Sequence, residues 1–328
     1  MKMNKRDYGI EALKAFAALI VMNSHMDLMY GDYSFLGTGG AIGDALFFFC
    51  SGYTLFWGRP ANFLNWYKRR IQRIYPTVLA IAFISATYGM NQIACSVLTN
   101  IGATWFVGCI FLYYILLYPI MKYMKDRMYY IMAAVSIVSV LWYWIIGIEK
   151  ISLGNIYGAT YFKWCFYFMF MLLGSICGKS VKEGQTIIMS IYKSTSLSLL
   201  SVVLFYGIYL YTLKNGLECL QLISIIPLMS LCYYLWHFTH SDAITFILNQ
   251  KVFGGIIIFI GGLCLELYLS QGFVFTTKLN FIFPLNIPII MVVAIFFAYI
   301  VRCISRFILQ TFQIEDYNWK KIIEPYIK

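Results

Sequence analysis

Residues 286–307 read NIPIIMVVAIFFAYIVRCISRF, an almost unbroken apolar run of the length that an α-helix needs to cross a bilayer. Similar runs recur along the chain, which has 328 residues, is 61% hydrophobic and only 12% charged, and has a mean hydropathy of +0.73. A transmembrane β-barrel would show short segments of alternating polarity instead. The sequence therefore predicts an all-α polytopic integral membrane protein, a helical bundle in which each helix satisfies its own backbone groups.

The polar interruptions divide the chain into about ten transmembrane helices, and the basic residues give these spans an orientation. Of the 25 Lys and Arg residues, 18 lie at the two ends of the chain or in and beside alternate loops, whereas 3 lie in the opposite loops. Because positively charged loops stay in the cytoplasm, we expect both the N-terminus and the C-terminus to be cytoplasmic. The predicted spans lie near residues 8–29, 41–57, 74–95, 102–124, 128–147, 158–178, 195–213, 217–238, 253–275 and 286–307.

No linker, repeat or low-complexity stretch divides the chain, so residues 1–328 are predicted to form a single membrane domain. The net charge of +11 comes from short basic clusters between apolar runs, so we expect membrane lipids and not nucleic acid as partners. The nine cysteines lie inside or beside apolar runs without metal-ligand spacing, which is typical of packing residues. The sequence therefore predicts no metal site.

Ionisable side chains inside predicted spans are candidates for function, because a charge in hydrocarbon is costly. Lys14 and His25 stand eleven positions apart in the first span, a spacing of three helical turns plus roughly 20°. We expect them to share one face, about 16 Å apart along the axis, in a polar stripe that points into the bundle. The alternative for His25 is a core histidine bonded to a neighbouring hydroxyl. Asp44 in the second span and Glu266 in the ninth are also candidates, and Lys14 is an available partner for Glu266.

Other polar residues in or near the spans have structural interpretations. Lys163 lies near the outer end of its span, where its long side chain is expected to reach the interface. His237 and His240 are three positions apart at the inner end of the eighth span, but no third metal ligand is spaced to join them. Anchoring at the interface together with Trp236 is therefore favoured.

The segment YKRRIQRIYP, residues 67–76, places Arg70 and Arg73 three positions apart in the predicted loop 58–73, just before the third span. Two guanidinium groups on one face can bind a phosphate in bidentate fashion. The alternative is the ordinary positive charge of a cytoplasmic loop. Pro76 is expected at the start of the helix that follows.

Taken together, these segments resemble, in order and over nearly the whole chain, the acyltransferase family 3 proteins. These are bacterial integral-membrane enzymes that modify cell-surface glycans. The family's Arg-x10-His motif is matched by Lys14 and His25, its FFxxSG motif by residues 48–52, its Arg-x-x-Arg motif by Arg70 and Arg73, its Trp-Phe pair by Trp105 and Phe106, and its LEIYLxQ-like segment by LELYLSQ with Glu266. Lys14 departs from the family's arginine, and it keeps the charge but loses the planar fork.

The resemblance implies a stand-alone membrane O-acyltransferase of the bacterial inner membrane. It would transfer an acyl group, usually acetyl from acetyl-CoA, to a hydroxyl of a carbohydrate acceptor, an extracellular or lipid-linked glycan. His25 would act as the general base or carry the acyl group transiently. The residues that the resemblance places in catalysis are His25, Glu266 and Lys14, and those that it places in acyl-CoA binding are Arg70, Arg73, Lys14 and Trp105.

Two functions from other classes are alternatives. A transporter or flippase of a lipid-linked glycan would also suit ten spans with charges at the midplane. Against it, the sequence shows no repeated halves and no pair of interrupted helices. A membrane scaffold or sensor is the third interpretation, but it would not need charges inside the spans.

Overall fold

The computed structural model describes residues 7–57, 62–90, 92, 94–96, 104–146, 155–158 and 162–325. Within these ranges the chain is helical and contains no strand, which confirms the prediction of an all-α polytopic membrane protein. Residues 91, 93, 102–103, 147 and 159–161 of the predicted spans lie outside the described residues.

The contacts of the chain divide it into two compact units, and several helices contribute to both. Unit 1 consists of Met1–Leu13, Asp44–Arg59 and Leu116–Gly254, and unit 2 consists of Lys14–Gly43, Pro60–Ile115 and Gly255–Lys328. The prediction of a single domain over residues 1–328 stays a prediction.

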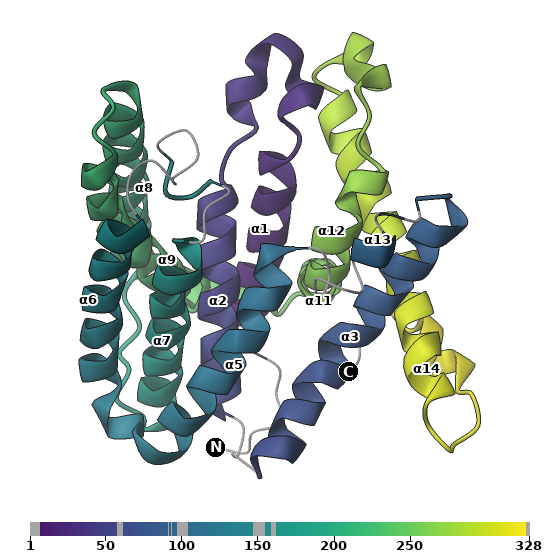
Figure 1. The fold of residues 1–328 in the computed structure, drawn as a ribbon, viewed down its shortest axis with the longest axis horizontal. Helices are drawn as coiled ribbons and strands as arrows, with labels where there is room; N and C mark the ends of the chain where they lie inside the picture. The colour runs from purple at the N-terminus through teal and green to yellow at the C-terminus, as the bar shows by residue number, and fades with distance from the viewer. Residues whose placement is uncertain are drawn as a thin grey trace. The chain divides into compact units, whose positions relative to one another are not determined.

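Unit 1 is built mainly from helices that follow one another in the chain. Here α6 packs on α7, and α8 packs on α9 (Figure 1). The helices that contribute to unit 1 are the first part of α1 (Tyr8–Ser24), α2 (Gly40–Trp57), the second part of α5 (Trp105–Tyr123), α6 (Met128–Ile146), α7 (Lys163–Lys182), α8 (Ile191–Lys214), α9 (Ile225–Thr239), α10 (Asp242–Leu248) and the first residues of α11 (Lys251–Gly262), with the 3₁₀ turns η2 (Lys125–Arg127) and η5 (Glu218–Ser224).

Unit 2 joins segments that are far apart in the sequence. Its centre is the contact of α13 with α3 and α12 (Figure 1). The elements that contribute are α1 (Tyr8–Ser24), η1 (Asp27–Leu36), α3 (Phe63–Thr87), the first part of α5, α11 (Lys251–Gly262), α12 (Cys264–Ser270), η6 (Gln271–Phe273), η7 (Thr277–Ile282), α13 (Asn286–Thr311) and α14 (Trp319–Ile323).

Six described helices are long and apolar enough to cross a membrane, or up to eight spans if each of two bent helix pairs is counted as one. These numbers rest on length and composition, and the predicted number of ten stays a prediction. The bent pairs are η1 with α2, at 100°, and α10 with α11, at 88°. The structure thus shows interrupted helices that the sequence did not reveal.

Two predicted boundaries are wrong for a clear reason. The ninth span, 253–275, is not one helix, because α11 ends at Gly262 and α12 begins at Cys264. The predicted loop 58–73 is helical from Phe63 on, because the Asn62 side chain accepts a hydrogen bond from the Leu64 backbone N–H and caps α3. Pro76 consequently lies inside α3 and not at its start.

Candidate functional site

A buried ion pair lies at the contact of α12 with α13 in unit 2. The Arg302 Nη2 of α13 is 3.2 Å from Glu266 Oε2 of α12, and its Nε is 3.4 Å from Oε1. About a tenth of each side chain is exposed. Two parallel contacts of this kind hold a carboxylate and a guanidinium in one relative orientation.

Glycine makes the room for this pair. A Cβ atom at Gly262, the last residue of α11, would lie 3.0 Å from Nη1 of Arg302. The chain then passes through Leu263 and begins α12, which puts Glu266 in the first turn. The interruption of the predicted ninth span therefore delivers the carboxylate to the guanidinium.

Two hydroxyl groups extend the pair toward α3. Thr77 of α3 donates to Glu266 Oε1 at 3.5 Å, and its hydroxyl is 3.1 Å from that of Ser305 on α13. Thr77 and Ser305 are both buried. Three helices thus share one polar network, in which both oxygens of the Glu266 carboxylate have hydrogen-bond partners. The prediction that this carboxylate has a cation or a hydroxyl nearby is confirmed.

Arg302 is the functional candidate that sequence reasoning missed. The expected partner of Glu266 was Lys14, but the ion pair in the structure is with Arg302. The signal was present, since Arg302 stands in the apolar run 286–307 and is an ionisable residue in a predicted span.

Lys14 lies next to the same helix. The thiol of Cys264, the first residue of α12, donates to the Lys14 carbonyl oxygen at 3.4 Å. The Lys14 side chain is half-buried. The structure therefore brings α1 at Lys14 beside the turn that carries Glu266.

His25 lies one residue beyond the helix that carries Lys14, so the helix of the predicted span 8–29 ends early, and the predicted shared face stays a prediction. α1 ends at Ser24, and the His25 backbone N–H donates to the Met22 carbonyl at 3.1 Å in a tight turn. At this turn the chain leaves α1 and enters η1. The end of η1 is held close to the end of α1, because the Asn23 side-chain amide donates a hydrogen bond to the Leu36 carbonyl at 2.8 Å. His25 is consequently an exposed residue at the start of the loop.

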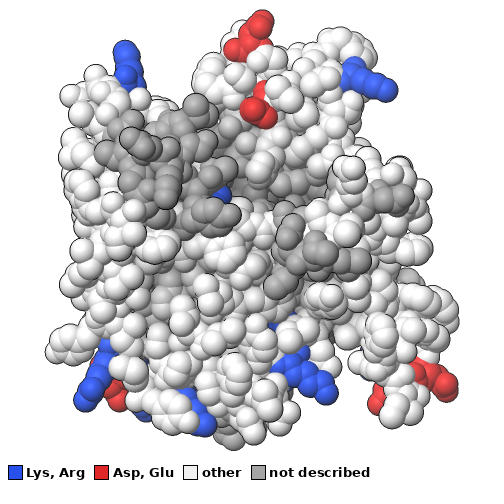
Figure 2. Space-filling view, in the orientation of Figure 1, with Lys and Arg blue, Asp and Glu red and all other residues white. Residues whose placement is uncertain are grey.

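Arg70 and Arg73 lie on the first half of α3, in the same unit. Arg70 is half-buried, and its guanidinium carbon is 5.2 Å from the centre of the Trp66 ring, whereas Arg73 is exposed. Figure 2 shows Lys and Arg side chains near the end of the molecule at which α3 begins in Figure 1. The two arginines can therefore face an anion from a rigid helix.

Trp105 is the first residue of α5, and its ring lies 5.9 Å from that of Phe106 in an edge-to-face arrangement. Phe106 in turn lies 5.2 Å from Tyr268, two residues after Glu266 on α12. This segment of α5 therefore packs against the helix that carries the ion pair.

The remaining candidates lie in unit 1, and two of the structural interpretations are wrong. Lys163 is 8% exposed and interacts electrostatically with Asp44, so its side chain does not extend to an interface. Trp236 and His237 are 1% exposed, and the aromatic packing around them replaces the expected interfacial anchoring.

His240 has a partner at the other end of the chain. Its Nε2 is 3.0 Å from Asp7 Oδ1, and the Tyr53 hydroxyl donates to Asp7 Oδ2 at 3.0 Å. Burial raises the pKa of Asp7, but the hydrogen bond and charge of His240, together with hydrogen bonds from the Ile10 backbone N–H and the Tyr53 hydroxyl, outweigh it and lower the pKa below its usual value of 3.8. No group of three or more His, Cys, Asp or Glu that could hold a metal occurs among the described residues.

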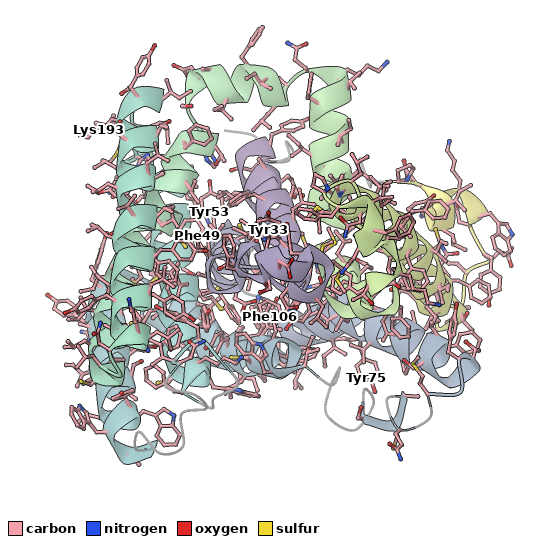
Figure 3. The ribbon with its side chains drawn as sticks, turned by 90° about the horizontal axis from the view of Figure 1, so that it is seen from above. Tyr33, Phe49, Tyr53, Tyr75, Phe106 and Lys193 are labelled. Atoms are coloured by element: carbon pink, nitrogen blue, oxygen red, sulfur yellow. The ribbon has the colours of Figure 1, made fainter. Side chains whose placement is uncertain are left out.

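The glycine of the FFxxSG-like segment, Gly52, packs closely against another helix of unit 1. A Cβ atom on Gly52 would lie 1.9 Å from the Met171 carbonyl oxygen of α7, and one on Gly174 of α7 would lie 1.9 Å from the Phe49 carbonyl oxygen. Gly174 and Gly178 form a G-x-x-x-G spacing, which lets membrane helices approach closely. Figure 3 labels Phe49 and Tyr53, which lie four positions apart on α2 and hence on the same side of it.

Comparison with known proteins gives one family. The family described as acyltransferase domain matches residues 7–304, which is nearly the whole chain. No curated protein and no solved structure matches the chain.

Proposed function

The chain belongs to this acyltransferase family and is a multi-pass membrane protein, and from this premise we propose that it transfers an acetyl group from acetyl-CoA to a carbohydrate hydroxyl. The acceptor that we propose is an extracellular or lipid-linked glycan, and the proposed location is the bacterial inner membrane. The observation that supports this reading best is that Lys14, His25, Glu266 and both arginines of the Arg-x-x-Arg pair all belong to unit 2.

The reaction needs a base, and we assign this role to His25. Its imidazole would take the proton from the acceptor hydroxyl as the oxygen attacks the thioester carbonyl. The carbon–sulfur bond then breaks, and the CoA thiolate leaves and is protonated by the imidazolium. The exposed position of His25 suits an acceptor that arrives from outside.

The charged residues of unit 2 would bind the donor. Arg70 and Arg73 would hold the phosphates of acetyl-CoA at the cytoplasmic side, and Lys14 would assist farther along α1. Since Arg302 already neutralises Glu266, the Lys14 charge does not need Glu266 as its counter-ion. Glu266 would then act as a positioning residue that, with Arg302, fixes α12 next to Lys14. The thioester arm would extend from the arginines through unit 2 toward His25.

Purified protein incubated with labelled acetyl-CoA and de-O-acetylated envelope polysaccharide tests the proposal. We expect label in the polysaccharide, and a loss of about 100-fold or more in rate for His25→Ala. His240→Gln, a histidine substitution in unit 1, is the matched control and should keep the rate. Transfer at the normal rate by His25→Ala would remove His25 from catalysis, and no label with the unaltered protein would reject the acetyltransferase.

A second candidate function is movement of a lipid-linked glycan across the membrane. The two bent helix pairs support it, because interrupted helices are typical of transporters. If the protein is a transporter, it should move a fluorescent lipid-linked glycan to the outer leaflet of protein-containing vesicles in the absence of acetyl-CoA. A quencher added outside the vesicles would then reach the fluorophore. Exposure that requires acetyl-CoA, or no exposure at all, argues against transport.

A further inference from the structure

The first three turns of α3 interleave aromatic and basic side chains. Residues 63–73 read FLNWYKRRIQR, and the proposed function uses only the two arginines of the Arg-x-x-Arg pair. The aromatic residues of this segment have no role so far. Positions 63, 67 and 70 recur at helical spacing, so Phe63, Tyr67 and Arg70 share one face of α3.

Phe63 and Tyr67 form a stacked ring pair. Their centres are 5.6 Å apart and their planes differ by 21°. Neither side chain is fully buried, so the pair keeps accessible ring surface. The Tyr67 hydroxyl donates to the Phe111 carbonyl of α5 at 3.5 Å, which fixes the ring relative to a second helix. The pair is therefore a held, partly exposed aromatic surface.

Arg70 lies one turn farther along the same face and keeps a hydrogen-bonding atom unused. Its guanidinium packs over Trp66, which is 1% exposed and meets Tyr114 edge to face at 6.0 Å. The buried Arg70 Nε has no hydrogen-bond partner among the described residues. A buried donor of this kind is costly unless a ligand or water accepts from it.

The neighbouring charges restrict what that ligand is. Lys68, Arg69 and Arg73 are exposed around Arg70, and no carboxylate stands between residues 62 and 90 of α3 and its flanks. An anion with several phosphates is therefore attracted to this segment. An anion that also carries a flat ring matches both the charges and the stacked pair, since aromatic side chains stack with bases of any type.

We propose that Tyr67 and Phe63 form the seat of the adenine base of the acyl-CoA donor, with Arg70 on the adjacent phosphate. This inference rests on the proposed function and adds the residues that select a nucleotide-bearing donor over a bare thioester. The base stacks on the accessible face of the ring pair, and Arg70 donates from Nε to a phosphate oxygen. The seat anchors the donor, and the thioester end lies beyond it.

The test compares two donors that differ only in the nucleotide. Full-length protein in phosphatidylcholine nanodiscs is assayed with acetyl-CoA and with S-acetylpantetheine, and equilibrium binding of CoA is measured separately. We expect Tyr67→Leu to weaken CoA binding about 10-fold and to raise the KM for acetyl-CoA equally, because it removes one stacking ring. The KM for S-acetylpantetheine should not change, and Tyr67→Phe should keep CoA binding within about twofold.

Tyr75→Leu is the matched control, because Tyr75 is also on α3 (Figure 3) but lies outside the Phe63, Tyr67 and Arg70 face. It should bind CoA normally. Adenosine 3′,5′-bisphosphate should compete with CoA on the unaltered protein and lose about 10-fold in potency on Tyr67→Leu. If Tyr67→Leu fails to fold, Phe63→Leu gives the same comparison with the other ring.

Each contrary outcome has its own meaning. CoA binding that is normal in both Tyr67→Leu and Phe63→Leu overturns the seat while leaving the proposed function intact. An equal rise in KM for both donors overturns it as well, because the ring would then act on the whole site. Unaltered protein that binds no CoA rejects the proposed function and the seat with it. Finally, added phosphatidylglycerol tests for competition at the same surface. If it abolishes CoA binding equally in all variants, the surface binds lipid headgroups, and the seat is overturned.

Discussion

The contact of α2 with α7 in unit 1 and the contact of α3, α12 and α13 in unit 2 bury helix surfaces by different means. In the first, glycines bring two backbones together, and a Ser175 hydroxyl donates to the Gly52 carbonyl at 3.2 Å. In the second, the Glu266 carboxylate of α12 and the Arg302 guanidinium of α13 form a buried ion pair between the helices. Between helices in lipid, close packing and hydrogen bonds drive association. The α2–α7 contact is therefore suited to a fixed framework, and the α12–α13 contact to a chemical site.

The rings of unit 1 reinforce that difference. Phe166 and Tyr167 of α7 lie 4.4 Å apart, and Phe162 lies 5.1 Å from Phe166, all with 1% exposure or less. Large rings at such spacing leave no room for displacement, because protein interiors are close-packed. Changes in unit 1 are thus expected to act on folding, and changes at the ion pair of unit 2 on activity as well, and four predictions test this.

The largest effect is expected at the α2–α7 contact. Gly174→Leu places a side chain where even a Cβ atom would be 1.9 Å from the Phe49 carbonyl oxygen, so the two helices must separate. We expect no detergent-stable monodisperse protein in fluorescence-detected size-exclusion chromatography. Gly207→Ala in α8 is the control, because no neighbouring atom lies within 4 Å of its Cβ position. A normal elution peak for Gly174→Leu would mean that this contact is not fixed.

The ion pair of unit 2 comes next. Arg302→Met leaves the Glu266 carboxylate buried beside only a hydroxyl, which should cost about 3–5 kcal/mol of stability. Adding Glu266→Gln to Arg302→Met should restore most of the thermal stability without restoring acetyl transfer. A double variant that is as unstable as Arg302→Met would show that the guanidinium acts through packing and not through its charge.

Thr77→Val should have a smaller effect on the same network. It removes the hydroxyl that bonds Glu266 and Ser305, at a cost of about 1–2 kcal/mol. Thermal unfolding and KM for acetyl-CoA should be measured together. We expect a lower unfolding temperature with the KM nearly unchanged, because α3 still presents its arginines. A large rise in KM instead would place Thr77 in donor binding.

The smallest effect is expected at the polar cluster of unit 1 and depends on pH. Because the pKa of Asp7 is lowered in the folded protein, the ionised carboxylate stabilises the fold at pH values above its usual pKa of 3.8. That contribution is lost as pH falls through the lower folded pKa. Asp7→Asn should therefore be less stable than the unaltered protein at pH 7, by on the order of 1 kcal/mol, and the difference should shrink below pH 4. A difference that is constant with pH would mean that the carboxylate charge contributes nothing.

Several residues of the candidate site can be predicted from residue types and spacing. Their charges lie in or beside apolar spans, and the structure places all four of them in unit 2, namely Lys14, Glu266, Arg70 and Arg73. The predicted first span, 8–29, continues past the end of α1 at Ser24, because apolar residues on both sides of His25 do not mark where the helix ends. The error at Lys163 came from its place in the sequence, because burial next to Asp44 depends on a helix more than a hundred residues away.

The sequence by itself determined that this is an all-helical membrane protein, because unbroken apolar runs have no other stable arrangement in lipid. It also determined which charged residues need partners. Only the tertiary structure decided which residues are in contact. Arg302 pairs with Glu266, Asp7 pairs with His240, and Gly52 packs against the backbone of α7. Partner choice depends on which helix faces meet, and periodicity along one helix carries no information about the helix beside it.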